Sequence, residues 1–229
     1  MIGPELIGKA NKTKMPISEV YNMDCLEYMK TIPDKHFDLC IADPPYGINA
    51  AKMTMGSGKK QWEKADWDSD VPAQEVFDEM FRVSKHQIIW GGNYFNLPLT
   101  GDWIVWDKLN PNLSFAEGEL AWCSIHKNLR IFKYYTGKSD NGGRIHPTQK
   151  PIALYSWLLE KYATGGAKIF DPFIGSGSSR IAAFMKDFDF YGCELNPTYF
   201  QAQEDRFRRE CFGEQKLKNG KTLIQESLF

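Results

Sequence analysis

The last third of the chain alternates helix-like and strand-like segments, and this pattern restricts the fold more than any other feature. Apolar residues recur at helical spacing in residues 151–163 and 181–188, and residues 196–211 form a third helical segment. Short apolar runs of the buried-strand type occupy residues 167–173 and 188–195. Strands that alternate with helices predict a mostly parallel sheet with helices on both faces. The predicted fold class is therefore α/β.

The rest of the chain adds elements of the same kind. A length of 229 residues suits a single domain over residues 1–229. Residues 1–16 are expected to be a flexible tail, and the stretch 47–71, which lacks periodicity, is expected to be a mobile loop. Residues 126–151 are expected to be a polar connection. Strands are expected over 17–24, 37–43, 87–92, 102–108 and 119–125, and helices over 25–33 and 72–84.

The composition excludes several classes of protein. Hydrophobic residues make up 42% of the chain, which is enough to bury a core, and no segment has the length of a signal peptide or a membrane span. We therefore expect a cytoplasmic protein that does not contact a membrane. The scattered cysteines form no CxxC pair, so they predict neither a metal site nor a disulfide framework. They are expected to be small buried hydrophobes: Cys25, Cys40, Cys123, Cys193 and Cys211.

Three chemically distinctive segments each stand at the end of a predicted strand. They are "DPPYG" at 43–47, "DPFIGSGSS" at 171–179 and "CELNP" at 193–197. In open α/β sheets, ligands bind at the carboxyl ends of the strands. We therefore expect these segments to contribute to one site.

The glycine turn has the features of a nucleoside site. Gly175 and Gly177 let the backbone turn tightly, and Glu194 closes the next strand, where an acid commonly accepts hydrogen bonds from ribose hydroxyls. Arg180 stands where a dinucleotide motif needs glycine, and no P-loop is present. S-adenosylmethionine suits such a turn, with Asp171 near its amino group. The alternative is a tight strand–helix connection that binds nothing.

The "DPPY" segment has the groups needed to activate an exocyclic base amine. The lone pair of such an amine is delocalised into the ring, and acceptors that hold its N–H groups favour a nucleophilic, pyramidal nitrogen. Asp43 offers one acceptor and the backbone carbonyl of Pro44 a second, because consecutive prolines fix the backbone. Tyr46 offers a face for an extruded base. The alternative is a Pro-Pro turn in which Asp43 caps a helix and Tyr46 lies in the core.

These motifs together resemble the β-class of S-adenosylmethionine-dependent DNA amino-methyltransferases. "DPPY" precedes "DPFIGSGS", and "HPTQKP" at 146–151, "GCELNPTYF" and "NMDCLEYMKTIPDKHFDL" are also typical of that class. The resemblance covers residues 17–211 and implies a Rossmann-like class I methyltransferase fold with circularly permuted motif order. It also implies that Asp43, Pro44 and Tyr46 bind and activate the base.

The resemblance assigns the cofactor contacts as well. It implies that Asp24 contacts the adenosine part of S-adenosylmethionine and that Glu194 holds the ribose. Further residues would surround the methionine part or complete the pocket: Phe170, Asp171, Phe173, Gly175, Gly177, Ser178, His146, Thr148 and Lys150.

The implied reaction is site-specific methylation of adenine N6 in double-stranded DNA. "DPPY" favours adenine over cytosine N4, whose enzymes in this class usually carry "SPPY". Cytosine N4 is the first alternative, followed by methylation of an RNA base or a protein glutamine, whose enzymes have the opposite motif order. An oxidoreductase is disfavoured by Arg180, and a DNA-binding module without activity is disfavoured by Asp43.

DNA contacts are expected from two segments. Family members usually insert a target-recognition region before "HPTQKP", and here that interval, 124–145, is short. We expect it and the 47–71 loop to share target recognition, with phosphate contacts that position the DNA. The resemblance also implies a prokaryotic or viral host, and it leaves open a homodimer and a cognate restriction endonuclease. The candidate DNA-binding residues are Lys52, Lys59, Lys60, Lys64, Arg130 and Lys133.

Overall fold

The computed structural model describes residues 15–48, 69–111, 116–135, 143–216 and 222–224. Its centre is an eight-stranded sheet in the order β1-β8-β7-β2-β3-β5-β4-β6. β5 is antiparallel to β3 and β4, and the other pairings in this sheet are parallel. The strands are β1 (Ser18–Tyr21), β2 (Phe37–Ala42), β3 (Ser84–Trp90), β4 (Trp103–Asp107), β5 (Gly118–Cys123), β6 (Arg130–Lys133), β7 (Lys168–Asp171) and β8 (Asp189–Cys193).

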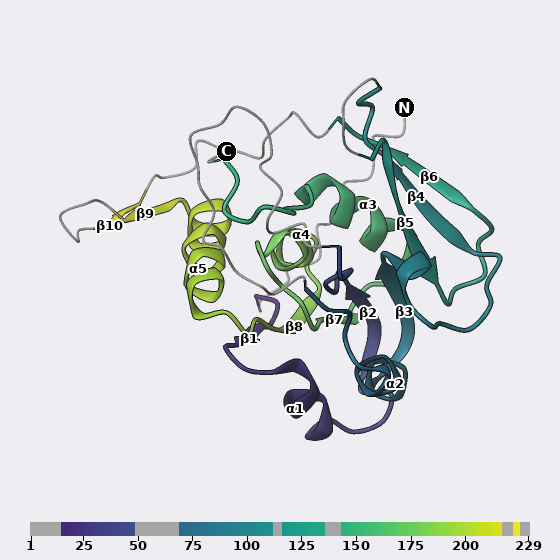
Figure 1. Ribbon diagram of the computed structural model, residues 1–229. Coiled ribbons are helices and arrows are strands. Elements are labelled where there is room, and N and C mark those ends of the chain that lie inside the picture. The colour runs from purple at the N-terminus through teal and green to yellow at the C-terminus, as the bar shows by residue number, and fades with distance from the viewer. Residues whose placement is uncertain (1–14, 49–68, 112–115, 136–142, 217–221, 225–229) are drawn as a thin grey trace, which may run out of the picture.

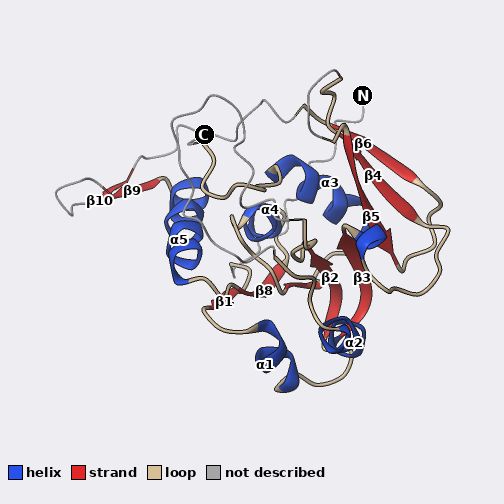
Figure 2. Ribbon diagram, in the orientation of Figure 1, coloured by secondary structure: helices blue, strands red, loops and turns tan. Residues whose placement is uncertain are grey.

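Helices cover both faces of the sheet, α1 and α2 on one face and α3 and α4 on the other (Figure 1). A short 3-10 helix, η2, follows β3, and a separate hairpin of β9 and β10 follows α5 (Figure 2). The bounds are α1 (Cys25–Lys30), α2 (Gln74–Val83), η2 (Gly92–Tyr94), α3 (Ile152–Tyr162), α4 (Ser178–Met185), α5 (Pro197–Phe212), β9 (Glu214–Lys216) and β10 (Thr222–Ile224). None of the helices described is long and apolar enough to cross a membrane.

Local sequence explains where the helices begin. The side chain of Asp24 accepts from two N–H groups of the first turn of α1, and Asn196 does the same for α5, with Pro197 next to it. Such caps each contribute about 1 kcal/mol. Gly177 precedes α4 with a φ of 75°, a conformation that L side chains rarely adopt. Glycine therefore suits the point where β7 turns into α4.

Apolar residues at helical spacing fill the two cores. On α3, Leu158 is fully buried and Tyr155 nearly so, as the periodicity predicts, and on α2 Met80 is fully buried. The first core cluster joins α3 and α4 to the sheet, and the second joins α1 and α2 to the opposite face. The predicted α/β class, with a mostly parallel sheet and helices on both faces, is confirmed.

Two expectations were wrong in detail, and one element was not foreseen. Residues 126–151 contain β6, an edge strand whose four residues carry too little periodicity to reveal it. The β9–β10 hairpin was not foreseen. Met185, one of the apolar residues at helical spacing in 181–188, is 54% exposed at the last position of α4. The cysteines are free thiols, buried except for the half-buried Cys211.

The order of the strands identifies a point where the chain reverses direction across the sheet. From β2 the chain continues through α2 to β3 on one side, and from the neighbouring β7 it continues through α4 to β8 on the other side. Ligands of open α/β sheets bind beyond the carboxyl ends of the strands at such a switch point. The segments that follow β2 and β7 are therefore the first place to look for a site.

Candidate active site

The two predicted motifs meet at the switch point. "DPPY" begins directly after β2 with Asp43, and the glycine turn begins at Asp171, the last residue of β7, which pairs with β2 (Figure 1). Burial raises the pKa of Asp171, and repulsion by the Asp43 carboxylate adds to this effect. Both segments thus lie at the same end of neighbouring strands.

Asp43 and Lys150 form the centre of a largely buried polar cluster. Lys150 Nζ lies 2.5 Å from Asp43 Oδ1 and 2.9 Å from Glu119 Oε2. The Tyr46 hydroxyl donates to the same Asp43 oxygen at 2.8 Å. Glu119 also pairs through Oε1 with Lys108 Nζ at 2.7 Å. Both of these hydrogen bonds to Asp43 use Oδ1, so among the described residues they leave Oδ2 available as an acceptor.

The charges in this cluster are set by burial and by one another. Burial raises the pKa of Asp43, and Glu119 adds to this effect while Lys150 opposes it. Burial would also raise the pKa of Glu119, but Lys150 and Lys108 outweigh it and lower that pKa to about 2. Burial lowers the pKa of Lys150, but the two carboxylates outweigh it, and the pKa is raised. Glu119 is therefore an anion and Lys150 a cation at neutral pH.

The ring of Tyr46 lies between close neighbours. Tyr94 stacks on it, with ring centroids 5.2 Å apart and 14° between the planes. Gly91 approaches the ring so closely that a Cβ would lie 2.3 Å from Tyr46 Cε1. With a φ of 67°, Gly91 also has a backbone that a side chain would strain. Tyr94 is 47% exposed, so this ring lies at the surface beside Tyr46.

The Asp171 carboxylate holds the start of the glycine turn. Oδ1 accepts from the Phe173 N–H at 2.9 Å, and Oδ2 accepts from the Ser179 hydroxyl at 2.5 Å. Asp171 is 1% exposed, and burial raises its pKa to about 7. A cationic ligand beside this carboxylate would favour its ionised form. A buried carboxylate at this position suits the amino group of S-adenosylmethionine, which the sequence analysis expects near Asp171.

Glu194 joins the end of β8 to the same turn. Its Oε2 accepts from the Gly175 N–H at 2.9 Å, and its Oε1 accepts from the Asn196 N–H at 2.8 Å. Burial raises the pKa of Glu194. Each carboxylate oxygen has a second acceptor position, so Glu194 can still accept from the hydroxyls of a ribose.

His146 and Thr148 border the glycine turn. The His146 ring lies 3.8 Å from where a Cβ of Gly175 would stand, and it packs edge-on against Tyr199 with centroids 4.4 Å apart. Thr148 Oγ1 lies 3.1 Å from His146 Nδ1. Burial lowers the pKa of His146 to about 3, so the imidazole is neutral. Its surroundings fit the predicted place beside a cofactor.

Lys150 connects the two motifs instead of lining only the cofactor side. Its ammonium points to Asp43, because two carboxylates there compensate for its burial, while its carbonyl accepts from the Ser178 hydroxyl at 2.7 Å. Arg206 of α5, which is fully buried, donates to the Ser178 hydroxyl and to the Ser176 carbonyl, each at 2.8 Å. Lys150 thus connects the start of α4, through its carbonyl, to Asp43, through its ammonium.

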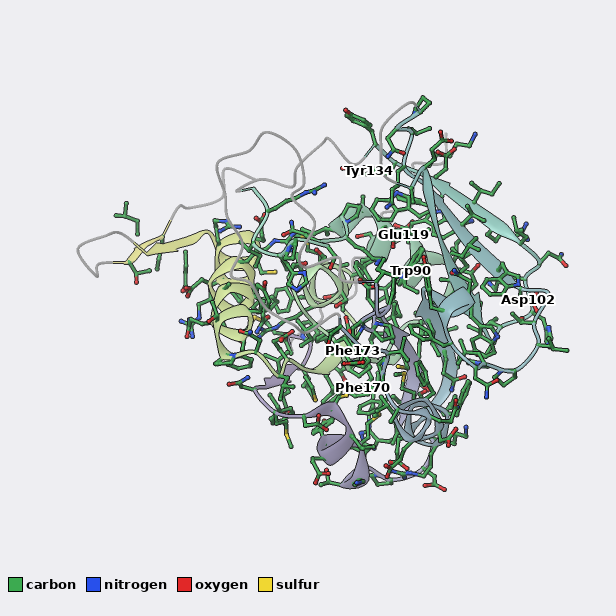
Figure 3. The ribbon with its side chains drawn as sticks, in the orientation of Figure 1. Trp90, Asp102, Glu119, Tyr134, Phe170 and Phe173 are labelled. Carbon is green, nitrogen blue, oxygen red and sulfur yellow. The ribbon has the colours of Figure 1, made fainter. Side chains whose placement is uncertain are left out.

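Three predicted cofactor contacts have structural roles in this conformation. Asp24 is the exposed N-cap of α1. Phe170 is fully buried and stacks on Phe37, with centroids 4.6 Å apart, so its side chain belongs to the core (Figure 3). Phe173 is partly buried and packs against the same core cluster. For Phe170, alternation along β7 explains the difference, because the neighbouring Asp171 points to the other face.

The predicted DNA contacts are only partly described. Arg130 and Lys133 are exposed at the two ends of the edge strand β6. Lys133 pairs in register with Asp107, the residue before Lys108, so it lies at the end of β4 that leads toward the site. Lys52, Lys59, Lys60 and Lys64, with most of the 47–71 loop, lie outside the described residues.

The sequence analysis missed Glu119, Lys108 and Tyr94. Glu119 is the single acid in the predicted strand "ELAWCSI", and an acid next to such an apolar run is a signal that was not used. Figure 3 shows Glu119 with Trp90, whose ring lies 5.4 Å from the Lys150 ammonium. Within the described residues, His, Cys, Asp and Glu form no group of three or more that could hold a metal ion.

Known proteins resemble this chain in sequence and in fold. Residues 89–205, just over half of the chain, match the family described as DNA methylase. The Type II methyltransferase M.HinfI of Haemophilus influenzae is 25% identical over 246 residues, which cover 84% of this chain and 68% of that protein. The structure of the M1.HpyAVI–SAM complex has 19% identity and a TM-score of 0.52 over 82% of this chain and 98% of that one. The cytosine-N4-specific PvuII DNA methyltransferase has 16% identity and a TM-score of 0.56, over 84% and 87%.

Proposed function

The chain belongs to the DNA methylase family, and from this premise we propose that it transfers a methyl group from S-adenosylmethionine to the N6 amine of an adenine in double-stranded DNA. Membership makes it an S-adenosylmethionine-dependent DNA methyltransferase that acts on an exocyclic amine. The family model disfavours the alternatives of an RNA base or a protein glutamine. The choice of adenine and the roles of individual residues are the proposal.

The observation that carries the proposal is the place of Asp43. It follows β2 at the switch point, one strand from the Asp171 end of the glycine turn. With Tyr46 and Lys150 bonded to Oδ1, the carboxylate is held so that Oδ2 can accept an N–H of the base amine. The Pro44 carbonyl accepts the second N–H. Two acceptors placed in this way favour a nitrogen whose lone pair points toward the electrophilic carbon.

The cofactor supplies an electrophilic methyl group, and the chain holds it at the glycine turn. In our proposal Asp171 binds the ammonium of the methionine part, and Glu194 binds the ribose hydroxyls. A buried carboxylate with a pKa of about 7 gains a counter-ion in this way, which supports the fit. His146 and Thr148 border the pocket from the side of α5.

The target base takes the place of the Tyr94 ring on Tyr46. Enzymes that modify a base extrude it from the duplex and hold it against aromatic side chains. Stacking contributes about 1–3 kcal/mol per base, and here the stack with Tyr94 is lost when the base enters. The displaced Tyr94 side chain then covers the entrance to the base site and no longer covers the Tyr46 ring. Its exposure supports such a movement.

Adenine is favoured over cytosine because the motif is "DPPY" and not "SPPY". The likeness to the cytosine-N4-specific PvuII enzyme concerns the fold, since only 16% of the residues are identical. Arg130 and Lys133 on β6, together with the lysines of the 47–71 loop, would contact DNA phosphates. A homodimer and a cognate restriction endonuclease stay predictions.

Sequencing with detection of modified bases tests the proposal. The chain is expressed in a host that lacks its own DNA methyltransferases, and the genomic DNA is compared with that of a host expressing Asp43→Ala. We expect N6-methyladenine within one short motif, and none with the variant. Methylation of cytosine N4 instead would reject adenine, and unmodified DNA would reject the proposed function.

A further inference from the structure

Resting on the proposed function, we propose that Glu119 is a positioning residue for methyl transfer: it shares the Lys150 ammonium with Asp43, so that Lys150 neutralises Asp43 only in part and leaves one of its oxygens available to the base amine.

The geometry shows how the cation is shared. Lys150 Nζ is within hydrogen-bond distance of Asp43 Oδ1, at 2.5 Å, and of Glu119 Oε2, at 2.9 Å. The Lys150 side chain is 4% exposed, and its ammonium also lies 5.4 Å from the centre of the buried Trp90 ring. A buried ammonium needs charged partners. The carboxylates of Asp43 and Glu119, which stand at the ends of two different strands, therefore determine the position of the Lys150 ammonium.

Glu119 is itself held from the opposite side. Its other oxygen binds Lys108 at 2.7 Å, and the side chains of Lys108 and Glu119 are 12% and 22% exposed. Glu119 pairs in register with Trp106 on β4, and Lys108 follows that strand. The row of charges thus runs Lys108, Glu119, Lys150, Asp43, with two positive and two negative groups.

Without the Glu119 charge, Asp43 would be the only carboxylate partner of Lys150 within the part of the chain that the structure describes. The complete ion pair would neutralise Asp43 at the moment when positive charge develops on the attacked amine nitrogen. The ammonium would also be free to bridge both oxygens of Asp43 and to compete with the base for Oδ2. Both effects weaken stabilisation of the transition state more than binding of either substrate.

The effect on Asp43 can be measured through its titration. Glu119 raises the pKa of Asp43 by Coulomb repulsion, and Lys150 lowers it. The hydroxyl of Tyr46, the Asp171 carboxylate after β7 and the Tyr155 phenol on α3 also face Asp43. Lys108→Gln leaves those three groups in place, and Glu119→Gln keeps an oxygen or amide near the Tyr46 hydroxyl, which lies 3.4 Å from Glu119 Oε2. A difference in pH dependence between the variants therefore reports on the charge row.

The experiment compares three variants of the whole chain by steady-state methylation of DNA from a methylation-deficient host, with labelled S-adenosylmethionine varied up to saturation and the pH varied from 5 to 9. Glu119→Gln keeps the shape and removes the charge. Lys108→Gln removes a positive charge on the far side of Glu119. Glu117→Gln, at an exposed acid two residues away, is the matched control.

We expect Glu119→Gln to lower kcat by about 10- to 100-fold, the range for loss of a hydrogen bond to a charged group, with KM for the cofactor within about 2-fold of wild type. The acid limb of its pH–rate profile moves to lower pH. Lys108→Gln moves the limb to higher pH, because Glu119 then lacks the counter-charge of Lys108 and its carboxylate repels Asp43 more strongly. General damage to the fold would not move the acid limb in opposite directions in the two variants. The control Glu117→Gln should have the kcat and the acid limb of wild type.

A Glu119→Gln enzyme with the kcat and the acid limb of wild type would overturn the inference. If that variant does not fold, Lys108→Gln decides alone: a limb moved to higher pH supports the inference, and an unmoved or lowered limb overturns it. Should the wild-type chain methylate no DNA at all, the proposed function fails instead. The two failures are therefore distinguishable.

Discussion

Replacing Asp171 by Asn should change how the stability of the protein depends on pH. The pKa of Asp171 is about 7 in the folded state, above its ordinary value of 3.8, because the carboxyl is buried. Between these two pH values the folded state binds more protons than the unfolded chain. The contribution of this group to stability is therefore fully present below about pH 4 and is lost as the pH rises through 7.

The size of the effect follows from the pKa. At pH 5 the folded-state pKa lies about two pH units higher, and each unit corresponds to about 1.4 kcal/mol. Asp171→Asn has no group to titrate, and its amide can still accept from the Phe173 N–H and donate to the Ser179 hydroxyl oxygen. The free energy of unfolding of the variant, relative to wild type, should therefore rise by about 2.7 kcal/mol between pH 5 and pH 8.

Urea unfolding of both proteins at the two pH values, at equal ionic strength, measures this difference directly. Other titrating groups cancel, because both proteins carry them. The same variant should bind S-adenosylmethionine about 10- to 100-fold more weakly, since the cofactor ammonium loses its anion. A relative stability that stays constant within about 0.5 kcal/mol, or that falls with pH, would refute the assignment of a buried, protonatable carboxyl.

Three further variants probe the site. Asp43→Ala should lower methyl transfer by at least about 100-fold with cofactor affinity unchanged; calorimetry beside the transfer assay checks both, and a fully active variant would disprove the role. Glu194→Gln should weaken cofactor binding about 10-fold or more while saturating cofactor restores most of kcat; unchanged affinity would count against the ribose contact. Gly91→Ala should displace the Tyr46 ring and lower kcat, in contrast to Gly101→Ala, which meets no atom within 4 Å; equal activity of the two would contradict the close approach seen at Gly91.

The sequence predicted the central elements because they carry strong local signals. Asn196 and Pro197 mark the start of α5, and apolar residues at helical spacing mark the buried face of α3. β6 lacks such a signal, since it is an edge strand of four residues with an exposed Arg130 and Lys133. Only its pairing with β4, which is a long-range contact, makes it a strand.

In the site, too, the features with a local sequence signal were predicted and those set by long-range contacts were not. Asp43 and Asp171 follow predicted strands, so the rule for strand ends brings them together without further information. The ion-pair and hydrogen-bond partners of these two carboxylates depend on packing between segments that are distant in the sequence. Lys150 turns to Asp43, and Glu119 joins it from β5, 31 residues earlier in the chain than Lys150. Phe170 was assigned to the cofactor from the motif alone, and the alternation of side chains along β7 places it in the core.

The most direct test of the account is to identify the nucleoside that receives the methyl group. Purified protein is incubated with DNA from a methylation-deficient host and S-adenosylmethionine carrying a trideuterated methyl group, and the digested nucleosides are separated and weighed by mass spectrometry. The account predicts deuterated N6-methyladenine, and its absence in the Asp43→Ala reaction. Deuterium found only in N4-methylcytosine, or in no nucleoside, would contradict it.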